Sequence, residues 1–551
     1  MTKYIFVVGG VISGVGKGVS VASIGKILQA YGFSVAAVKI DPYINYDAGT
    51  LRPTEHGEVW VTEDGGETDQ DLGNYERFLS INVPKKNCIT TGQIYKAIID
   101  REREGGYLGQ TVQFIPHVPD EIKSRIEGAA NGSDVVLVEI GGTVGDYENI
   151  PFLLSAKSLE RKIGKENVIY VLVTYLPTPF HINEAKTKPT QQAIQQLFGL
   201  GIFPDFILCR AAEQIDDVRK KKIETYVNIE KECVISAPDV TNLYSIPLNF
   251  EKENLGKKLL EKLHLEPKKN PDWSRWQQLV DNSSNPGKEV NIAIIGKYLD
   301  IGNCQLTDSY LSIKEAIVHS AAHLNCRANI SWLDSKNFEN GKSTESLKDY
   351  DGIIIPGGFG SSGVEGKINA IRFCRENNVP FLGLCLGMQL AVVEFARNVC
   401  GLDAHSTEID QETKEPVIDL MPWQTELLKN SRYGATMRLG AYPAEIKQGT
   451  KVHELYSQLK RFQNPEKNIV SERHRHRYEV NQDYHSVLEE KGLVLSGWHI
   501  CNYGAKLVEF IELPKHRFFV ATQAHPEFKS RFENPAPLFY GFMSACLKKP
   551  F

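Results

Sequence analysis

Short apolar runs alternate with helical patterns along the first half of the chain. A helix is expected at residues 20–31, and strands are expected at residues 3–8, 34–40, 134–140, 168–174 and 206–209. These runs are continuously apolar and are bounded by glycine or proline, which is typical of parallel strands buried on both faces of a sheet. The pattern therefore predicts an α/β fold.

The same rhythm restarts at Asn291 after an interruption. Strands are expected at residues 291–295, 351–355, 379–384 and 518–522, with a helix at 306–322. The interruption contains Pro267, Pro271 and Pro286-Gly287, which favour a linker, and its two tryptophans, Trp273 and Trp276, suggest that it is partly docked. We expect two doubly wound α/β domains with mainly parallel sheets: residues 1–266, a linker at 267–290, and residues 291–551.

Composition narrows the class of protein. The chain has 551 residues, 42% apolar and 24% charged, with a formal net charge of −5, which gives no general reason to expect nucleic-acid binding. No apolar stretch is long enough to span a bilayer, and the N-terminus lacks a signal-peptide pattern. The ten cysteines are scattered without a close C-x-x-C pair. We expect a cytoplasmic protein with reduced thiols and neither membrane nor nucleic acid as a partner.

The most informative turn lies around Cys385. The sequence Gly383-Leu384-Cys385-Leu386-Gly387 joins an expected strand to an expected helix. A sharp turn of this kind exposes a nucleophile, and the helix N-terminus favours a thiolate. The turn therefore predicts a cysteine nucleophile.

A base and an oxyanion site are visible elsewhere in the second half. His525 and Glu527 are two residues apart after an expected strand, so both side chains face the same side of an extended backbone and can pair. Pro356-Gly357-Gly358 also follows an expected strand, and its backbone N–H groups can stabilise a tetrahedral intermediate. Three such pieces at the ends of strands predict catalysis, with Cys385, His525 and Glu527 as the catalytic residues.

The first half carries a glycine-rich loop between its first strand and helix. Residues 9–18 expose N–H groups at a helix N-terminus, and Lys17 adds a positive charge for phosphates. The loop departs from the regular G-x-x-x-x-G-K-[ST] pattern because Gly18 stands where Ser or Thr would hold magnesium. A plain glycine-rich turn remains the alternative at this point.

Magnesium must then be held by other oxygen ligands. The candidates are the acidic loop at residues 63–71, which includes Asp71, and Glu139 at the end of an expected buried strand. A second anion site is suggested by two lysines and two hydroxyl groups ahead of a helix at residues 186–191, although a generic basic loop explains that stretch equally well.

The second half resembles class I glutamine amidotransferase domains through its G-x-C-x-G, P-G-G and H-P-E motifs. The whole chain resembles the CTP synthase family, and the matching stretches are residues 39–45, 56–59, 71–78 and 472–481. The resemblance implies ATP-dependent amination of UTP to CTP, through a 4-phosphorylated UTP, with ammonia that a cysteine thioester step releases from glutamine.

The resemblance also implies roles for particular residues. Positions that match ATP binding are Gly14, Val15, Gly16, Lys17, Gly18, Val19 and Asp71, and those that match magnesium binding are Asp71 and Glu139. Positions that match UTP or CTP binding are Ser13, Asp146, Tyr147, Glu148, Lys186, Thr187, Lys188, Pro189, Thr190, Gln191 and Lys222. Positions that match glutamine binding are Gly358, Leu386, Gly387, Met388, Gln389, Glu408 and Arg477.

Family members are tetramers that CTP inhibits and GTP activates, so a homotetramer with these effectors is expected. The family usually has an aromatic-arginine pair where this chain has Ser361-Ser362, which puts activation by GTP in question. Two alternatives stay open at this stage. One is another ATP-dependent glutamine amidotransferase, which would lack the second nucleotide site; the other is a nucleotide-responsive assembly protein without catalysis.

Overall fold

The computed structural model describes residues 1–51, 57–181, 184–227, 229–297, 300–301, 304–305, 307–339, 343–358, 360–420, 437–501 and 504–549. The chain forms two compact units. The first comprises Met1–Thr50 and Glu67–Val280, and the second comprises Leu51–Gly66 and Asp281–Phe551. A short segment of the first half of the sequence, Leu51–Gly66, therefore packs with the second unit. No helix in the described part of the chain is long and apolar enough to cross a membrane.

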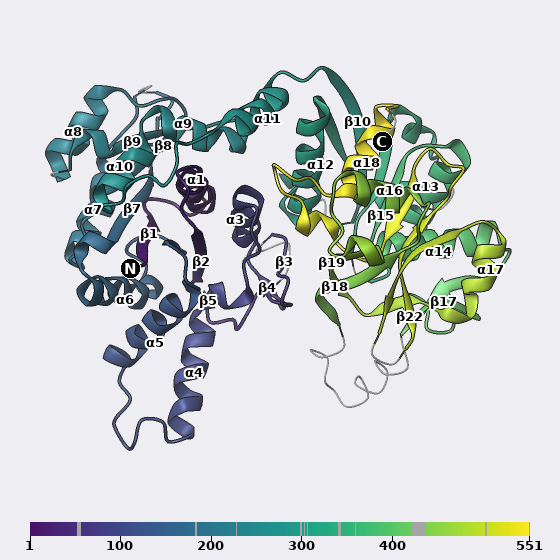
Figure 1. The fold of residues 1–551 in the computed structure, drawn as a ribbon, viewed down its shortest axis with the longest axis horizontal. Coiled ribbons are helices and arrows are strands. Elements are labelled where there is room, and N and C mark those ends of the chain that lie inside the picture. Colours follow the sequence, from purple (N-terminus) through teal and green to yellow (C-terminus); the bar gives the residue numbers. More distant parts are fainter. Residues whose placement is uncertain are drawn as a thin grey trace. The chain divides into compact units, whose positions relative to one another are not determined.

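The first unit is built on a seven-stranded parallel sheet with the order β5-β2-β6-β1-β7-β8-β9 (Figure 1). Its strands are β1 (Lys3–Gly9), β2 (Val35–Asp41), β5 (Cys88–Thr90), β6 (Val135–Ile140), β7 (Val168–Tyr175), β8 (Phe206–Ala211) and β9 (Val234–Pro238). Its helices are α1 (Lys17–Ala30), α3 (Asp71–Leu79), α4 (Thr91–Arg103), α5 (Phe114–Ala129), α6 (Ile150–Ile163), α7 (Lys188–Gly199), α8 (Asp217–Val227), α9 (Ile246–Lys252) and α10 (Leu255–Lys262). The predicted parallel sheet is confirmed here.

Helices cover both faces of this sheet. Tyr4, Phe6 and Val8 point to one face, where they join a core with buried residues of α4, α5, α6 and α7. The residues between them point to the other face, where α1 packs with α3 and α9. Burial on both faces explains why these strands are continuously apolar in sequence.

The second unit has a nine-stranded sheet with the order β13-β10-β14-β15-β23-β22-β21-β18-β19. Its strands are β10 (Lys288–Gly296), β13 (Cys326–Asp334), β14 (Gly352–Ile355), β15 (Phe381–Leu384), β18 (Arg438–Ile446), β19 (Ile469–His476), β21 (Val494–Ile500), β22 (Lys506–Glu512) and β23 (Phe519–Thr522). The pairs from β13 to β23 are parallel, as expected, whereas those from β23 to β19 are antiparallel. The α/β class is thus confirmed, and the antiparallel extension is a feature that the apolar pattern did not show.

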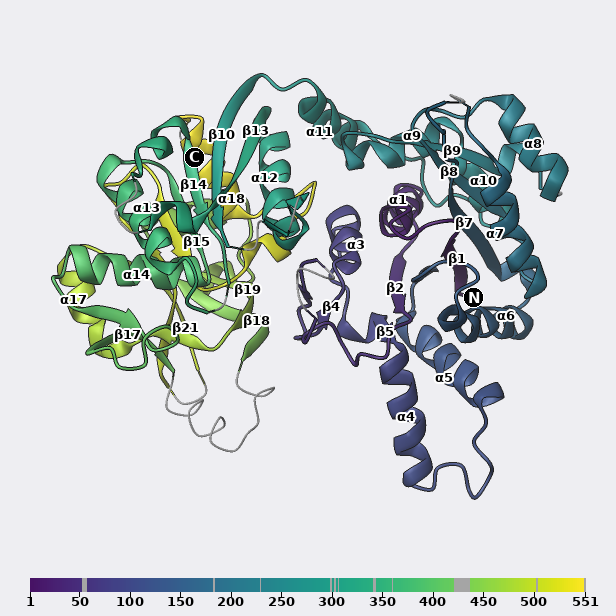
Figure 2. The same ribbon diagram turned by 180° about the vertical axis from the view of Figure 1, so that it is seen from behind.

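Two helical layers enclose the parallel part of this sheet (Figure 2). The helices are α12 (Leu311–Leu324), α13 (Val364–Asn377), α14 (Leu386–Asn398), α16 (Lys451–Gln458), α17 (His485–Glu490) and α18 (Pro537–Cys546). Ala293 and Ile295 share a core with α13 and α14, while Ile292 and Ile294 share a core with α12, α16 and α18. This alternation along β10 places the two layers on opposite faces.

The stretch expected to be a linker contains a helix, α11 (Ser274–Ser284). Trp276, Leu279 and Val280 are buried at helical spacing. The Trp276 indole packs on Phe78 and donates a hydrogen bond to the carbonyl oxygen of Tyr244 at 2.7 Å. Prolines flank this helix without interrupting it. The expected docking of the tryptophans is therefore made by a helix, through Trp276, which packs within the first unit.

Candidate active sites and nucleotide-binding loops

Cys385 lies on a strained turn between β15 and α14. Its φ of 51° is in the left-handed region that non-glycine residues avoid, and its N–H group donates to the carbonyl oxygen of Thr522 at 2.8 Å. A side chain at Gly383 would lie 2.8 Å from the Cβ atom of Ala521, and one at Gly387 would collide with the carbonyl oxygen of Ile355. Both glycines of the motif are therefore required by close packing.

His525 and Glu527 form the expected pair. The Nδ1 atom of His525 is 2.7 Å from Oε1 of Glu527, and the backbone N–H group of His525 donates to the carbonyl oxygen of Arg473. Burial alone would lower the pKa of His525, but the negative charges of Glu527 and Cys385 raise it to about 10. The imidazole is therefore held as a cation beside the sulfur, which is the arrangement that favours a thiolate.

The glycine loop after β14 lies against this pair. A Cβ atom built on Gly357 would be 2.8 Å from Cε1 of His525 and 3.5 Å from Cβ of Cys385. No side chain fits there, so the backbone of the loop comes close to Cys385. This is the approach that an oxyanion site requires.

A small pocket opens beside the sulfur. It is lined by Gly358, Cys385, Gln389, Glu408, His476, Arg477 and Tyr478. The structure thus brings together four of the residues expected to bind glutamine, while Leu386, Gly387 and Met388 form the first turn of α14. Burial raises the pKa of Glu408, against the opposing effect of Lys297 and Arg477. The pocket therefore offers one carboxylate, Glu408, and one cation, Arg477, which suits an amino acid with both charges.

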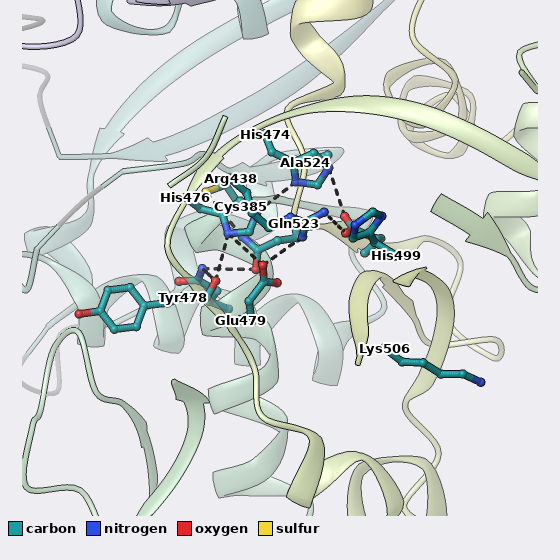
Figure 3. Close-up of polar contacts among 12 residues, drawn as sticks. Cys385, Arg438, His474, His476, Tyr478, Glu479, His499, Lys506, Gln523 and Ala524 are labelled. Atoms are coloured by element: carbon teal, nitrogen blue, oxygen red, sulfur yellow. Dashed lines mark hydrogen bonds and ion pairs between the residues drawn. The ribbon is translucent and has the colours of Figure 1, made fainter. Parts of the chain in front are cut away.

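A buried polar cluster supports the wall of this pocket (Figure 3). Arg438 donates hydrogen bonds to Glu479 at 3.0 Å and to Glu509 at 2.7 Å, and the ring nitrogens of His474 and His476 are 3.0 Å apart. Burial raises the pKa of Glu479 to about 7 and lowers the pKa values of both histidines well below their usual range. The histidines are therefore neutral. Sequence reasoning missed this cluster because its members come from separate strands.

A second cavity of about 220 Å³ also reaches Cys385 and His525. Its other lining residues include Tyr310 and Phe528 and, from the first half of the sequence, Leu51, Glu58 and Val59. The segment that carries Glu58 is held in the second unit by several contacts. Glu63, expected to belong to a magnesium loop, instead pairs with Lys529 at 3.0 Å and with Arg473 at 3.4 Å.

The glycine loop of the first unit ends at Gly16, which has a φ of 90° and begins α1. Lys17 is buried, and its Nζ atom donates to the carbonyl oxygen of Gly142 at 2.6 Å. A side chain at Gly18 would collide with the carboxylate of Asp71. The departure from the regular phosphate-loop pattern therefore has a structural reason, because Asp71 occupies the space of a Ser or Thr side chain. Arg210, which sequence reasoning missed, lies against Gly16.

Asp71 and Glu139 meet at a lysine that the sequence analysis did not single out. The Nζ atom of Lys39 contacts Asp71, lies 3.2 Å from Glu139 and 3.4 Å from Asp41, and Tyr75 donates a hydrogen bond to Glu139. Burial raises the pKa of Asp41 to about 8 and raises that of Glu139, whereas Lys39 keeps the pKa of Asp71 low against the effect of its burial. Carboxylates outnumber cations in this cluster.

This donor set fits magnesium. Asp71 and Glu139 both contact the Nζ atom of Lys39, so the two carboxylates border the same cationic position, and their surplus negative charge favours a further cation with oxygen ligands. Among the described residues, no group of three or more His, Cys, Asp or Glu side chains has a geometry that can hold a metal. Phosphate oxygens and water would have to complete the coordination, as is usual for magnesium.

The residues expected at the second nucleotide site lie around the start of α7. Lys188 is exposed, the half-buried Lys186 pairs with Glu184 at 2.8 Å, and Thr190 is buried against Thr174. Thr187 and Gln191 are linked by a hydrogen bond, Pro189 lies in the first turn, and Lys222 is exposed on α8.

The loop that contains Asp146, Tyr147 and Glu148 is exposed. A Cβ atom on Gly145 in this loop would meet Gln196 of α7 at 2.7 Å. This loop and the second half of α7 are therefore neighbours within one unit. Ser13 and Gly14 are exposed in the first loop, where Val15 is buried and Val19 lies in α1.

Comparison with known proteins covers both halves. The family described as "CTP synthase N-terminus" matches residues 3–265, and the family described as "Glutamine amidotransferase class-I" matches residues 305–545. The CTP synthase of Thermococcus gammatolerans is 51% identical over 100% of both chains. That of Methanocaldococcus jannaschii is 50% identical over 99% of this chain and 98% of its own, and that of Methanococcus maripaludis is 49% identical over 99% and 100%. Because this identity extends over the whole length and over both units, the chain belongs to the CTP synthase family.

Proposed function

We propose that the chain makes CTP by ATP-dependent amination of UTP, through a 4-phosphorylated UTP and a glutamyl thioester on Cys385. Family membership makes it a glutamine-hydrolysing ligase that converts UTP to CTP. The observation that carries the finer proposal is that one chain holds both a cysteine–histidine–glutamate site and a separate lysine–carboxylate site.

The glutaminase reaction is assigned to Cys385, His525 and Glu527. The thiolate attacks the side-chain amide of glutamine, and His525 gives its proton to the departing ammonia. Water then attacks the thioester, the C–S bond breaks, and glutamate leaves. The charges around the pocket support this substrate, since Arg477 can bind its α-carboxylate and Glu408 its α-ammonium group.

The amination is assigned to the first unit. The loop from Gly14 to Val19 would hold ATP, and Ser13, Lys186–Gln191 and Lys222 would hold UTP, with Asp146–Glu148 recognising the pyrimidine of CTP. Asp71 and Glu139 would hold magnesium, which would neutralise phosphate charge when bound. Lys17, at the helix N-terminus, adds a further positive charge for the transferred phosphoryl group.

Released ammonia must stay neutral to act as a nucleophile, so it needs shelter from bulk water. The cavity of about 220 Å³ beside Cys385 and His525 is large enough to hold it. Leu51, Glu58 and Val59 line this cavity. Residues from the first half of the sequence would therefore surround the ammonia at the place where Cys385 releases it.

The proposal includes a homotetramer that CTP inhibits. Exposed apolar side chains on the α4–α5 pair, Ile99, Leu108, Phe114 and Ile115, support burial of this surface against another copy. Activation by GTP stays a prediction, and Ser361 and Ser362 are exposed where the family has its aromatic-arginine pair. The cytoplasmic location also stays a prediction.

Two assays that follow the absorbance change from UTP to CTP test the division of labour, one with glutamine and one with ammonium chloride. Cys385→Ala should abolish the glutamine-dependent rate and leave the ammonia-dependent rate unchanged. Lys17→Ala should abolish both. Cys400→Ala, a thiol of the same unit outside the pocket, is the control and should change neither rate. Loss of both rates in a folded Cys385→Ala protein would refute the proposal.

A further inference from the structure

A buried glutamine contacts the nucleophilic sulfur. The side chain of Gln523 has no exposed surface, and its Nε2 atom donates a hydrogen bond to Sγ of Cys385 at 3.8 Å (Figure 3). Neither the reaction as described above nor the sequence motifs use this amide. Since a buried amide that lacked its partners would be costly, the orientation of Gln523 matters to the site.

The orientation of the Gln523 amide follows from its neighbours. Nε2 of Gln389 lies 3.0 Å from the carbonyl oxygen of Tyr478, which can only accept a hydrogen bond, so the amino group of Gln389 must face that side. The same amino group lies 3.3 Å from Oε1 of Gln523. The oxygen of Gln523 is thereby directed to Gln389, and its N–H groups are directed to the sulfur.

Backbone contacts hold this arrangement at both ends. The N–H group of Gln523 donates to the carbonyl oxygen of Glu509 on β22 at 2.9 Å. The carbonyl oxygen of the preceding residue, Thr522, accepts a hydrogen bond from the N–H group of Cys385 at 2.8 Å. The backbones that carry the amide and the sulfur are therefore held together at the end of β23, and the contact of Oε1 with Gln389 orients the amide.

We propose that Gln523 is a further catalytic residue of the glutaminase reaction, which donates a hydrogen bond to the Cys385 thiolate and stabilises it both before attack and as the leaving group of the thioester. The inference rests on the proposed role of Cys385 as nucleophile. Hydrogen bonds to a charged acceptor are stronger than those to a neutral one, so the donor favours S⁻ over the neutral sulfur of the thioester. Its largest effect is therefore on hydrolysis of the thioester, where S⁻ is released.

Gln523→Met tests the role of the donor because methionine has a similar volume and no N–H group. The rate of alkylation of Cys385 by iodoacetamide should reach half its maximum about one pH unit higher than in the unchanged protein. The kcat for glutamine hydrolysis should fall about tenfold, and KM for glutamine should fall with it because the acyl-enzyme accumulates. The ammonia-dependent rate should be unchanged.

Asn369→Leu is the matched control. It removes an amide of the same unit that donates to the carbonyl oxygen of Phe338 at 2.9 Å, away from the sulfur, and it should leave the alkylation profile unchanged. Should Gln523→Met fail to fold by circular dichroism, Gln523→Glu keeps the shape and replaces the donor by carboxylate oxygens. Alkylation of this second variant at pH 8 should be slower than that of the unchanged protein.

A folded variant at position 523 with an unchanged alkylation profile and an unchanged kcat for glutamine hydrolysis would overturn the inference and leave Gln523 as a packing residue. This outcome is distinct from a failure of the proposed function. In that case Cys385→Ala would keep glutamine hydrolysis, whatever the effect of substitutions at Gln523.

Discussion

Lys39→Met is the most direct test of how the proposed amination site is held together. The Lys39 side chain is 5% exposed and lies among carboxylates, of which Asp41 at 6% and Glu139 at 2% are similarly buried. Removing one partner of a buried ion pair costs about 3–5 kcal/mol because the remaining charge is left uncompensated. We therefore expect the first unit to be destabilised by about 4 kcal/mol at pH 8.

Hydrogen–deuterium exchange of peptides from β2 and β6 measures this loss within the first unit alone. About 4 kcal/mol corresponds to exchange that is roughly a thousandfold faster. Lys96→Met is the control, because Lys96 forms an exposed pair with Asp100 and its loss should leave β2 and β6 unchanged.

The destabilisation caused by Lys39→Met should depend on pH in a defined direction. Burial raises the pKa values of Asp41, to about 8, and of Glu139, and Lys39 opposes this rise, so in the variant both carboxyl groups should bind protons at higher pH than in the unchanged protein. Asp71 also loses the Lys39 charge that keeps its pKa low against burial, so in the variant its carboxyl group should be protonated more readily as the pH falls. The difference between variant and unchanged protein should therefore shrink from pH 8 to pH 5.5. Equal exchange in both proteins, or a difference that does not change with pH, would refute the charge-compensation argument.

Two further predictions concern Glu527, the partner of His525, and α11 at the end of the first unit. In Glu527→Gln, burial should lower the pKa of His525 from about 10, so the imidazolium is lost near neutral pH. The rate of glutamate release at pH 7 should therefore fall at least about tenfold. An unchanged pH profile of that rate would contradict this reasoning. In Trp276→Ala, loss of the buried indole and of its hydrogen bond to Tyr244 should cost about 3–5 kcal/mol. Thermal unfolding of this variant should show an earlier transition, and an unchanged transition would show that α11 contributes nothing to the stability of the first unit.

Local patterns were sufficient for features that depend on neighbouring residues. Three such features were predicted: the turn around Cys385, the pairing of His525 with Glu527, and the glycine loop ahead of Lys17. Each involves only a few consecutive residues after a strand, so the local backbone geometry follows once that strand is recognised. The parallel sheet of the first unit was likewise readable, because burial on both faces leaves a continuous apolar run.

The sequence by itself therefore determined the α/β class and the family, and it predicted Cys385, His525 and Glu527 as catalytic residues. Only the tertiary structure decided that Lys39 joins Asp71 to Glu139, that residues 51–66 pack with the second unit, and that Gln523 faces the sulfur of Cys385. Each of these depends on strand order and register, which bring together residues far apart in the chain. No local periodicity records such a pairing, because the same side chains would have the same pattern beside any other neighbour.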